Sequence, residues 1–328
     1  MQKITRENLI NKAIELLDNG TVNRVLGWKA GEFAYDVTPA VFTTKEDLEK
    51  NFVFDDFCNA NFSKYLVAET RKANEKVLVF LKPCDTYSFN QLLTEHRFAR
   101  EKVYAVGIPC EGMLDIGKIK ALAGEGIIEV VSGEDSITVK NLYDEEKTLA
   151  YADVLTERCL SCKSKKHVAY DELMGEEGDV LDSNRFDEVE KIEKMTPDER
   201  FAFWQAQLSK CIRCNACRDI CPACTCEKCV FDNPKSSVNN KAISDSFEEK
   251  MFHIIRAFHV AGRCTDCGEC SRVCPQGIPL HLLNRKFIKD INSLYGDYQA
   301  GEEEGSRAPL INYTFDDPEP GEAVGRGV

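Results

Sequence analysis

A cysteine motif that occurs twice constrains this chain more than any other feature. Each copy has three cysteines with two residues between neighbours, then three further residues and a fourth cysteine directly before a proline. The copies are Cys211-x2-Cys214-x2-Cys217-x3-Cys221-Pro222 and Cys264-x2-Cys267-x2-Cys270-x3-Cys274-Pro275. Four thiolates with this spacing bind a [4Fe–4S] cluster, whereas structural zinc sites use two separated pairs of ligands. The repeat therefore predicts two cubane clusters.

The order of the cysteines indicates which of them share a cluster. In two-cluster ferredoxins the first three cysteines of a motif bind one cluster and the fourth binds the other. This rule predicts one cluster on Cys211, Cys214, Cys217 and Cys274, and a second on Cys264, Cys267, Cys270 and Cys221. Two motifs linked by a helical segment resemble the helical ferredoxin modules of respiratory and heterodisulfide-type reductases. That resemblance implies electron transfer between two neighbouring clusters.

Length and charge narrow the class of protein. A chain of 328 residues is long enough for two or three domains with their own cores, so its 16 cysteines are not needed as disulfides. The net charge of -13 argues against nucleic acid or an anionic membrane as the main partner. Residues 1–17 predict an amphipathic helix rather than a signal peptide, and no apolar stretch is long enough to span a bilayer. We therefore expect a cytoplasmic protein whose thiolates bind metal.

Apolar runs and helix signals predict two domains. The strand-like runs lie at residues 77–81, 103–108, 127–131 and 136–139. Their near-continuous apolar character predicts strands buried on both faces and alternating with helices, so residues 1–180 are expected to form an α/β domain. Helix signals around the two motifs predict a mainly helical, dicluster ferredoxin-like domain over residues 181–299. Residues 300–328 are acidic and rich in Gly and Pro, and they are expected to form a tail.

Four cysteines outside the motifs could be gathered by folding. Cys84 and Cys110 each end a strand-like run, and Cys159 and Cys162 form a pair with two residues between them. If the two strands are parallel neighbours, Cys84 and Cys110 meet at one edge of the sheet, where α/β proteins bind ligands. The four cysteines would then form a third ligand set. The alternative is two structural cysteines and a separate zinc or redox pair.

The same segments resemble a known family. The resemblance is carried by residues 19–46 (NGTVNRVLGWKAGEFAYDVTPAVFTTKE), 82–85 (KPCD), 107–112 (GIPCEG) and 158–167 (RCLSCKSKKH). In order and spacing they are similar to the beta subunits of deazaflavin (coenzyme F420) reducing hydrogenases and formate dehydrogenases, over about residues 8–180. The resemblance implies that Cys84, Cys110, Cys159 and Cys162 bind a [4Fe–4S] cluster. It also implies a neighbouring FAD that reduces deazaflavin.

The chain departs from that family where the flavin would bind. Residues 8–12 (NLINK) replace a glycine-rich helix start whose backbone amides approach the flavin pyrophosphate. Residues 51–58 (NFVFDDFC) replace a stretch of small residues. Because these larger side chains obstruct the pyrophosphate, we predict a chain that carries electrons without an FAD of its own. A chain that retains FAD is the alternative.

Four cysteines remain after these assignments, namely Cys58, Cys224, Cys226 and Cys229. The last three follow the first motif in PACTCEKC and need one more ligand to complete a tetrahedral zinc site or a fourth cubane. Cys58 is the one unassigned cysteine, which gives the hypothesis of a fourth set of four. That set requires the two domains to pack against each other. The alternatives are a site completed by a carboxylate, a histidine or a partner residue, and a group of free thiols.

Together these patterns predict an iron–sulfur electron-transfer subunit of an anaerobic, multi-subunit redox complex. The expected partners are a catalytic dehydrogenase or hydrogenase subunit and a flavin-containing or heterodisulfide-reductase-like subunit, with ferredoxin as a further candidate. The chain has no Ser/His/Asp arrangement, phosphate loop or dinucleotide motif, so no catalytic residue is predicted. The rival functions are an FAD-dependent subunit that reduces deazaflavin or ferredoxin, and a zinc-containing scaffold. The ligands leave the direction of electron flow open.

Overall fold

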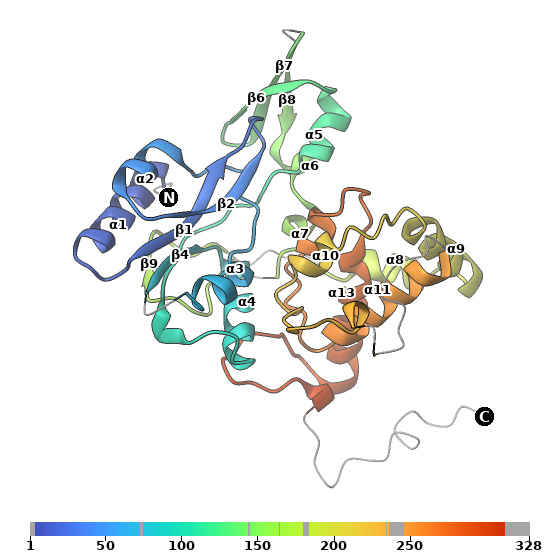
Figure 1. The fold of residues 1–328 in the computed structure, drawn as a ribbon. Coiled ribbons are helices and arrows are strands. Elements are labelled where there is room, and N and C mark those ends of the chain that lie inside the picture. The colour runs from blue at the N-terminus through green and yellow to red at the C-terminus, as the bar shows by residue number, and fades with distance from the viewer. Residues whose placement is uncertain are drawn as a thin grey trace.

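The computed structural model describes residues 4–72, 75–143, 145–163, 165–179, 184–233, 235 and 246–311. An α/β N-terminal half, up to residue 179, leads into a mostly helical C-terminal half that begins at residue 184 (Figure 1). The expected domain boundary between residues 180 and 181 lies outside the described residues, as do residues 312–328 of the expected tail. Within the described part of the chain, no helix is long and apolar enough to cross a membrane.

A mixed sheet forms the centre of the N-terminal half. Its strands are β1 (Arg24–Ala30), β2 (Val37–Phe42), β3 (Phe52–Val53), β4 (Val77–Leu81), β5 (Val103–Gly107) and β9 (Glu172–Leu173). The order is β2-β1-β4-β5-β9, with β3 also paired to β1. Strands β1, β4, β5 and β9 run parallel, and β2 and β3 run antiparallel to β1. Every residue of β4 is buried, as its continuous apolar run predicts for a strand covered on both faces.

Helices pack around this sheet. They are α1 (Arg6–Asp18), α2 (Lys45–Asn51), α3 (Ser63–Glu69), α4 (Pro83–Thr94) and the 3-10 turn η1 (Arg100–Lys102). Helix α1 begins at an N-cap, Thr5, as predicted, and buries Leu9, Ile10, Ala13 and Leu16 in the core. The parallel pairing of β4 with β5 confirms the predicted neighbours. The residues that follow these two strands therefore meet at the same edge of the sheet.

A second, three-stranded antiparallel sheet projects from the first (Figure 1). It contains β6 (Ile127–Ser132), β7 (Ser136–Asn141) and β8 (Glu146–Ala150), flanked by α5 (Ile116–Ala123) and α6 (Tyr151–Val154). The strands predicted at residues 127–131 and 136–139 are confirmed, but the expectation that both their faces are buried is wrong. Ile128 and Val131 are 44% and 54% exposed, because only one face of this sheet packs against α5 and α6.

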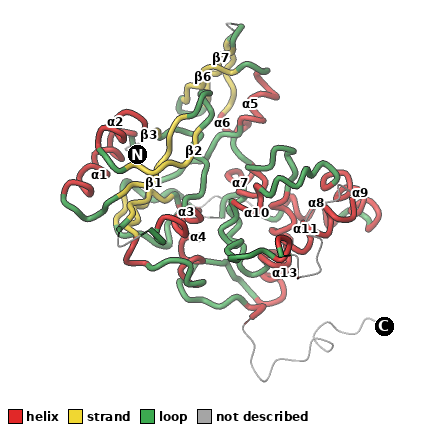
Figure 2. The backbone as a smooth tube through the Cα atoms, in the orientation of Figure 1, coloured by secondary structure: helices red, strands yellow, loops and turns green. Residues whose placement is uncertain are grey.

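The C-terminal half consists of helices joined by the cysteine loops (Figure 2). The N-terminal half also contains the short helix α7 (Glu157–Leu160), which precedes β9. The helical half contains α8 (Asp187–Glu193), α9 (Pro197–Leu208), α10 (Ala216–Asp219), the 3-10 turn η2 (Val230–Asp232), α11 (Ser246–Val260), α12 (Glu269–Arg272) and α13 (Leu280–Tyr295). Helix α9 begins with the predicted capping box of Thr196 and Glu199 and with Pro197 at its first position. The long helices α11 and α13 pack together, and the short helices α10 and α12 contact each other.

The segment after α13 packs against both halves, which differs from the expected tail. The Tyr298 hydroxyl donates to the Gly262 carbonyl at 2.9 Å, and the Gly305 amide donates to the Thr94 hydroxyl of α4 at 2.9 Å. At Gly301, with φ of 76°, a β-carbon would lie 1.8 Å from the Tyr87 carbonyl oxygen. Only glycine allows this close approach. Residues 300–311, which end at η4 (Pro309–Ile311), therefore tie α4 to the helical half.

Buried ion pairs hold the two halves together. Glu269 on α12 is fully buried and accepts from Arg158 of the N-terminal half at 2.7 Å and from Arg272 at 2.8 Å. Arg158 also donates to the Cys267 carbonyl at 2.6 Å and to the Asn59 carbonyl at 2.7 Å. Burial alone raises the pKa of Glu269, but Arg158 and Arg272 outweigh it and lower that pKa to about 2. The carboxylate is therefore charged throughout the neutral range.

Replacing Glu269 with Gln is expected to destabilise the folded chain by about 3 kcal/mol, because the buried guanidinium of Arg158 loses its counter-charge and that of the more exposed Arg272 loses a partner. The contribution of a carboxylate with a lowered pKa is complete above its ordinary pKa of 4.5 and is lost as pH falls toward 2. The loss should therefore be the same at about pH 6 and pH 8. The urea midpoint of the anaerobic protein measures it. Glu125→Gln, at an exposed carboxylate paired with Lys120, is the matched control, and equal midpoints for both variants would contradict the prediction.

Candidate metal centres

The two cysteine motifs fold into matching loops. In each loop the residues two and four positions after the first cysteine have positive φ, with 53° at Arg213, 63° at Asn215, 60° at Asp266 and 67° at Gly268. Each loop then enters a one-turn helix, α10 or α12, that carries the third cysteine. A left-handed backbone conformation is unfavourable for any residue other than glycine, so the surrounding structure must stabilise it at these positions. The repeated sequence thus produces the same sharp turn twice, with three thiols around each turn.

The first predicted ligand set lines one cavity. Its lining includes Cys211, Cys214, Cys217 and, from the second motif, Cys274. The pKa of Cys217 is raised to about 12. Burial is the main cause, the neighbouring thiols raise it as well, and Arg256 opposes the rise. Thiols packed this closely need the positive charge of a metal to ionise together. The donor set therefore fits a cluster bound by four cysteines, with Cys214 at the exposed end.

The second predicted set gathers around Cys221 of the first motif. Burial raises the pKa values of the other three members, Cys264, Cys267 and Cys270, and the charge of Cys221 raises each of them further. Cys264 packs against Cys221, and the charge of Cys221 acts on all three thiols, although at least 42 residues of the sequence lie between them. The crossed arrangement that the motif rule predicts is the one that the fold places together.

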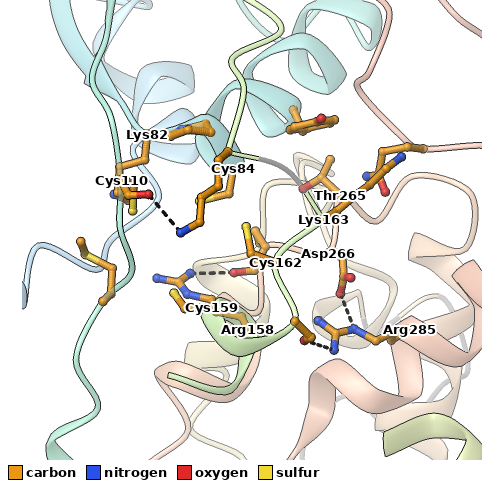
Figure 3. A pocket seen from close by; sticks show the side chains of 17 residues that line it. Lys82, Cys84, Cys110, Arg158, Cys159, Cys162, Lys163, Thr265, Asp266 and Arg285 are labelled. Carbon is orange, nitrogen blue, oxygen red and sulfur yellow. Dashed lines mark hydrogen bonds and ion pairs between the residues drawn. The ribbon is translucent and has the colours of Figure 1, made fainter. Parts of the chain in front are cut away.

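The dispersed cysteines meet in a third cavity, shown in Figure 3. Cys84 lies in the first turn of α4 after β4, Cys110 follows β5, and Cys159 and Cys162 lie in and just after α7. All four line the same cavity at the carboxyl edge of the parallel strands. Burial is the main cause of raised pKa values for Cys84 and Cys110. The structure thus brings together the four thiols that the sequence left scattered.

Positive side chains surround this third cavity. Lys82 is buried, ion-pairs with Asp85 at 3.0 Å, and donates to the backbone carbonyls of Cys58 and Ala60. Arg158 also lines the cavity. Burial lowers the pKa of Arg158, but the charges of Glu269, Cys159 and Cys84 raise it by more. A cluster with four thiolates is an anion. Both cations also have carboxylate partners, Asp85 and Glu269, so they offset only part of the charge of such a cluster.

The third cavity shares a wall with the second ligand set. Thr265, Asp266 and Cys267 of the second motif line it alongside Cys84 and Cys110 (Figure 3). The Thr265 hydroxyl lies 2.7 Å from that of Ser88 on α4, which fixes the loop against the N-terminal half. The two centres are therefore neighbours across the boundary between the halves.

Two residues of α11 lie beside the dicluster thiols. His253 Nε2 is 3.3 Å from Cys211 Sγ, and burial together with Arg256 and Arg213 lowers the pKa of His253 to about 3. The imidazole is therefore neutral at physiological pH. Arg256 is 4% exposed and donates to the Cys217 carbonyl at 3.0 Å. Burial lowers its pKa, but the Cys221, Cys270 and Cys217 thiolates raise it more, so this guanidinium faces both ligand sets.

Cys58 lies away from the other unassigned cysteines. It is fully buried in the core of the N-terminal half, and its thiol contacts the Val53 carbonyl and the Asp55 carboxylate. Cys224, Cys226 and Cys229 instead line a cleft in the C-terminal half that Cys58 does not reach. The structure therefore does not bring together the fourth set that was predicted. The reason is local, because a tight turn at residues 55–58 points the Cys58 thiol back onto its own backbone.

The residues where a flavin pyrophosphate would bind do not fit an anion. A pocket beside Cys110 is lined by four carboxylates, those of Asp55, Asp56, Glu111 and Glu176, and by one guanidinium, Arg6. Arg6 is committed to the backbone carbonyls of Phe52 and Glu49. At the start of α1 the side chains of Thr5 and Asn8 form a capping box. They accept hydrogen bonds from backbone N–H groups at the N-terminus of the helix, which are the groups that could otherwise bind a phosphate.

Sequence reasoning missed four residues that the structure places at these centres, namely Arg158, His253, Arg256 and Glu269. Arg158 directly precedes Cys159, and Glu269 lies within the second motif, next to Cys270. A charged residue beside a cluster ligand is a sequence signal that could have identified both. His253 and Arg256 have no such signal. Their roles depend on which face of α11 packs against the two loops.

Comparisons with known proteins agree with these observations. Residues 207–278 match the model of the 4Fe-4S dicluster domain family. A curated relative, the F420-dependent formate dehydrogenase subunit beta of Methanocaldococcus jannaschii, is 31% identical over 109 residues. That match covers 33% of this chain and 27% of the relative, so this chain spans only about a quarter of that protein. The predicted resemblance to this beta-subunit family, with a dicluster domain, is confirmed.

A solved structure also shows a limited likeness. The matching chain belongs to the F420-reducing [NiFe] hydrogenase complex of Methanosarcina barkeri, in a structure with xenon. It is 13% identical, and the match covers 62% of this chain and 86% of that chain with a TM-score of 0.38.

Proposed function

We propose that this chain, which is similar to the beta subunits of F420-dependent formate dehydrogenases and carries a 4Fe-4S dicluster domain, is the iron–sulfur electron-transfer subunit of a formate dehydrogenase or hydrogenase type complex. The observation that carries the proposal is the shared wall between the third cavity and the second motif. Cys267 belongs to the second ligand set and also lines the cavity of Cys84, Cys110, Cys159 and Cys162. Three thiol-lined sites thus lie in series.

The order of the sites follows from the residues between them. The site at the sheet edge adjoins the Cys264 set, and Arg256 lies between the Cys264 set and the Cys211 set. Bound [4Fe–4S] clusters supply one-electron transfer, so three such sites in series support a relay. The protein contributes ligation, burial, and the cations that set each potential. Cys214 is exposed, so the Cys211 site is the end of the series that faces solvent in the C-terminal half.

The proposed partners complete the relay at both ends. One is a catalytic dehydrogenase or hydrogenase subunit, and the other is a flavin-containing or heterodisulfide-reductase-like subunit. The proposal assigns no chemistry on substrate to this chain. The support for a formate dehydrogenase type complex is the name of the curated relative, and the support for a separate flavin subunit is the misfit between a pyrophosphate and the pocket beside Cys110.

Anaerobically purified chain should contain at least about 12 iron atoms, at four per cubane, and no stoichiometric flavin. Adjacent reduced clusters should broaden each other's electron paramagnetic resonance (EPR) signals, because crossed ligands bring the centres close together. Iron, sulfide and flavin assays with a redox titration followed by EPR test this. One FAD per chain, or reduction of deazaflavin by the isolated chain, would overturn the relay in favour of a flavoprotein.

A further inference from the structure

Three cysteines outside the relay line one cleft of the C-terminal half. Cys224, Cys226 and Cys229 belong to the segment between α10 and η2, and the opposite wall of the cleft is α11. His259 of α11 lines the same cleft. None of the three cysteines is needed by the two motif sets or by the site at the sheet edge. The cleft is therefore a separate group of potential metal ligands.

The charges around the cleft are unbalanced. Arg218 is paired with Asp219 and Asp232, and Arg263 is paired with Glu95. Lys64 and Arg256 also line the cleft, and neither forms an ion pair with a carboxylate of the described residues. Arg256 is 4% exposed, and its Nε has no hydrogen-bond partner there. Arg256 faces the thiols of both motif sets and also Cys224, so it would attract an anion in the cleft as well as the two motif clusters.

The cleft also touches the relay. Cys224 packs against Cys221, which belongs to the second ligand set, and Lys64 donates to the Cys224 carbonyl. Lys64 comes from α3, so the N-terminal half fixes one side of the cleft. A centre bound here would lie next to the middle site of the series.

We propose that Cys224, Cys226 and Cys229 hold a fourth [4Fe–4S] cluster through three thiolates, with its fourth iron facing the cleft that His259 lines. A [4Fe–4S] cluster takes four ligands, one on each iron, so three thiolates leave one iron open toward the cleft. The cleft lining carries more basic side chains than carboxylates even when Glu227 is included, and this surplus of positive charge fits an anionic cluster. This site replaces the set that would have included Cys58.

The test compares the iron content of the reconstituted full-length chain with that of the Cys226→Ser/Cys229→Ser double variant. Wild-type chain is expected to hold about 16 iron atoms and as many labile sulfides, and the double variant about 12, at four irons per cubane. Cys224 is left intact because it contacts Cys221. Cys58→Ser is the matched control, since it removes an unassigned cysteine from the other half, and it should keep about 16 irons.

Equal iron content in wild type and double variant, or the loss of one zinc instead of four irons, overturns the fourth cluster. Loss of iron in Cys58→Ser comparable to that of the double variant would restore the set with Cys58 and would also overturn this site. These outcomes are distinct from failure of the relay, which would appear as iron below about 12 in the wild-type chain.

Discussion

Replacing Cys159 and Cys162 together with Ser is expected to remove about four iron atoms per chain, at four per cubane, and to leave the two motif clusters in place. Both cysteines line the cavity at the sheet edge, and neither lines the cavity of the Cys211 set. Two remaining thiols, Cys84 and Cys110, are too few to hold a cubane. Iron and sulfide assays measure the loss, and EPR shows which signals remain.

The same variant should interrupt the relay. Dithionite should still reduce the motif clusters, but electrons delivered by a partner at the N-terminal half should no longer reach them. Cys58→Ser is the control, because that thiol is buried in the same half and touches no ligand set. Full iron content in the Cys159/Cys162 variant would show that these cysteines bind no cluster.

Replacing Arg256 with Met is expected to lower the reduction potentials of both motif clusters. A guanidinium about 10 Å from a cluster, at an effective dielectric constant of about 20, favours the added electron by about 1.7 kcal/mol, or roughly 70 mV. Arg256 faces Cys217 of one set and Cys221 and Cys270 of the other, so one substitution should shift both potentials. A redox titration followed by EPR measures the shifts.

Two further variants separate charge from packing. Arg256→Lys retains the charge and should restore most of the potential of each cluster. Arg218→Met removes a guanidinium that is already paired with Asp219 and Asp232, so its potentials should match those of the wild type. If Arg256→Met and Arg256→Lys shift the potentials equally, charge is not the cause.

Some parts of the site followed from the sequence because they are local. The spacing of each motif fixes a loop of a few residues, and the structure shows the same pair of left-handed residues in both copies. The neighbours β4 and β5 were also predictable, since short, fully apolar runs between helices favour parallel strands buried on both faces. The same reasoning failed for β6 and β7. Their apolar residues pair in a small sheet that has only one covered face.

Other parts depended on contacts between distant segments. The hypothesis that included Cys58 rested on the number of cysteines. That number does not show where each thiol points in the folded chain. The turn at Asp55 points the Cys58 thiol into its own core, while Cys224, Cys226 and Cys229 lie around a cleft of the other half. The tail prediction rested on composition. Composition could not show that Gly301 and Gly305 pack against Tyr87 and Thr94 of α4.

Local sequence was enough to identify two ferredoxin-type cysteine motifs and the parallel neighbours β4 and β5, because ligand spacing and apolar runs are properties of neighbouring residues. How the centres lie relative to one another depended on the tertiary fold. It placed Cys267 in the wall of the sheet-edge cavity, buried Arg158 and Glu269 between the halves, and turned Arg256 toward both motif sets. The first two relations depend on how the halves pack, and the third on which face of α11 packs against the two loops. Packing between separate segments leaves no local pattern in the sequence.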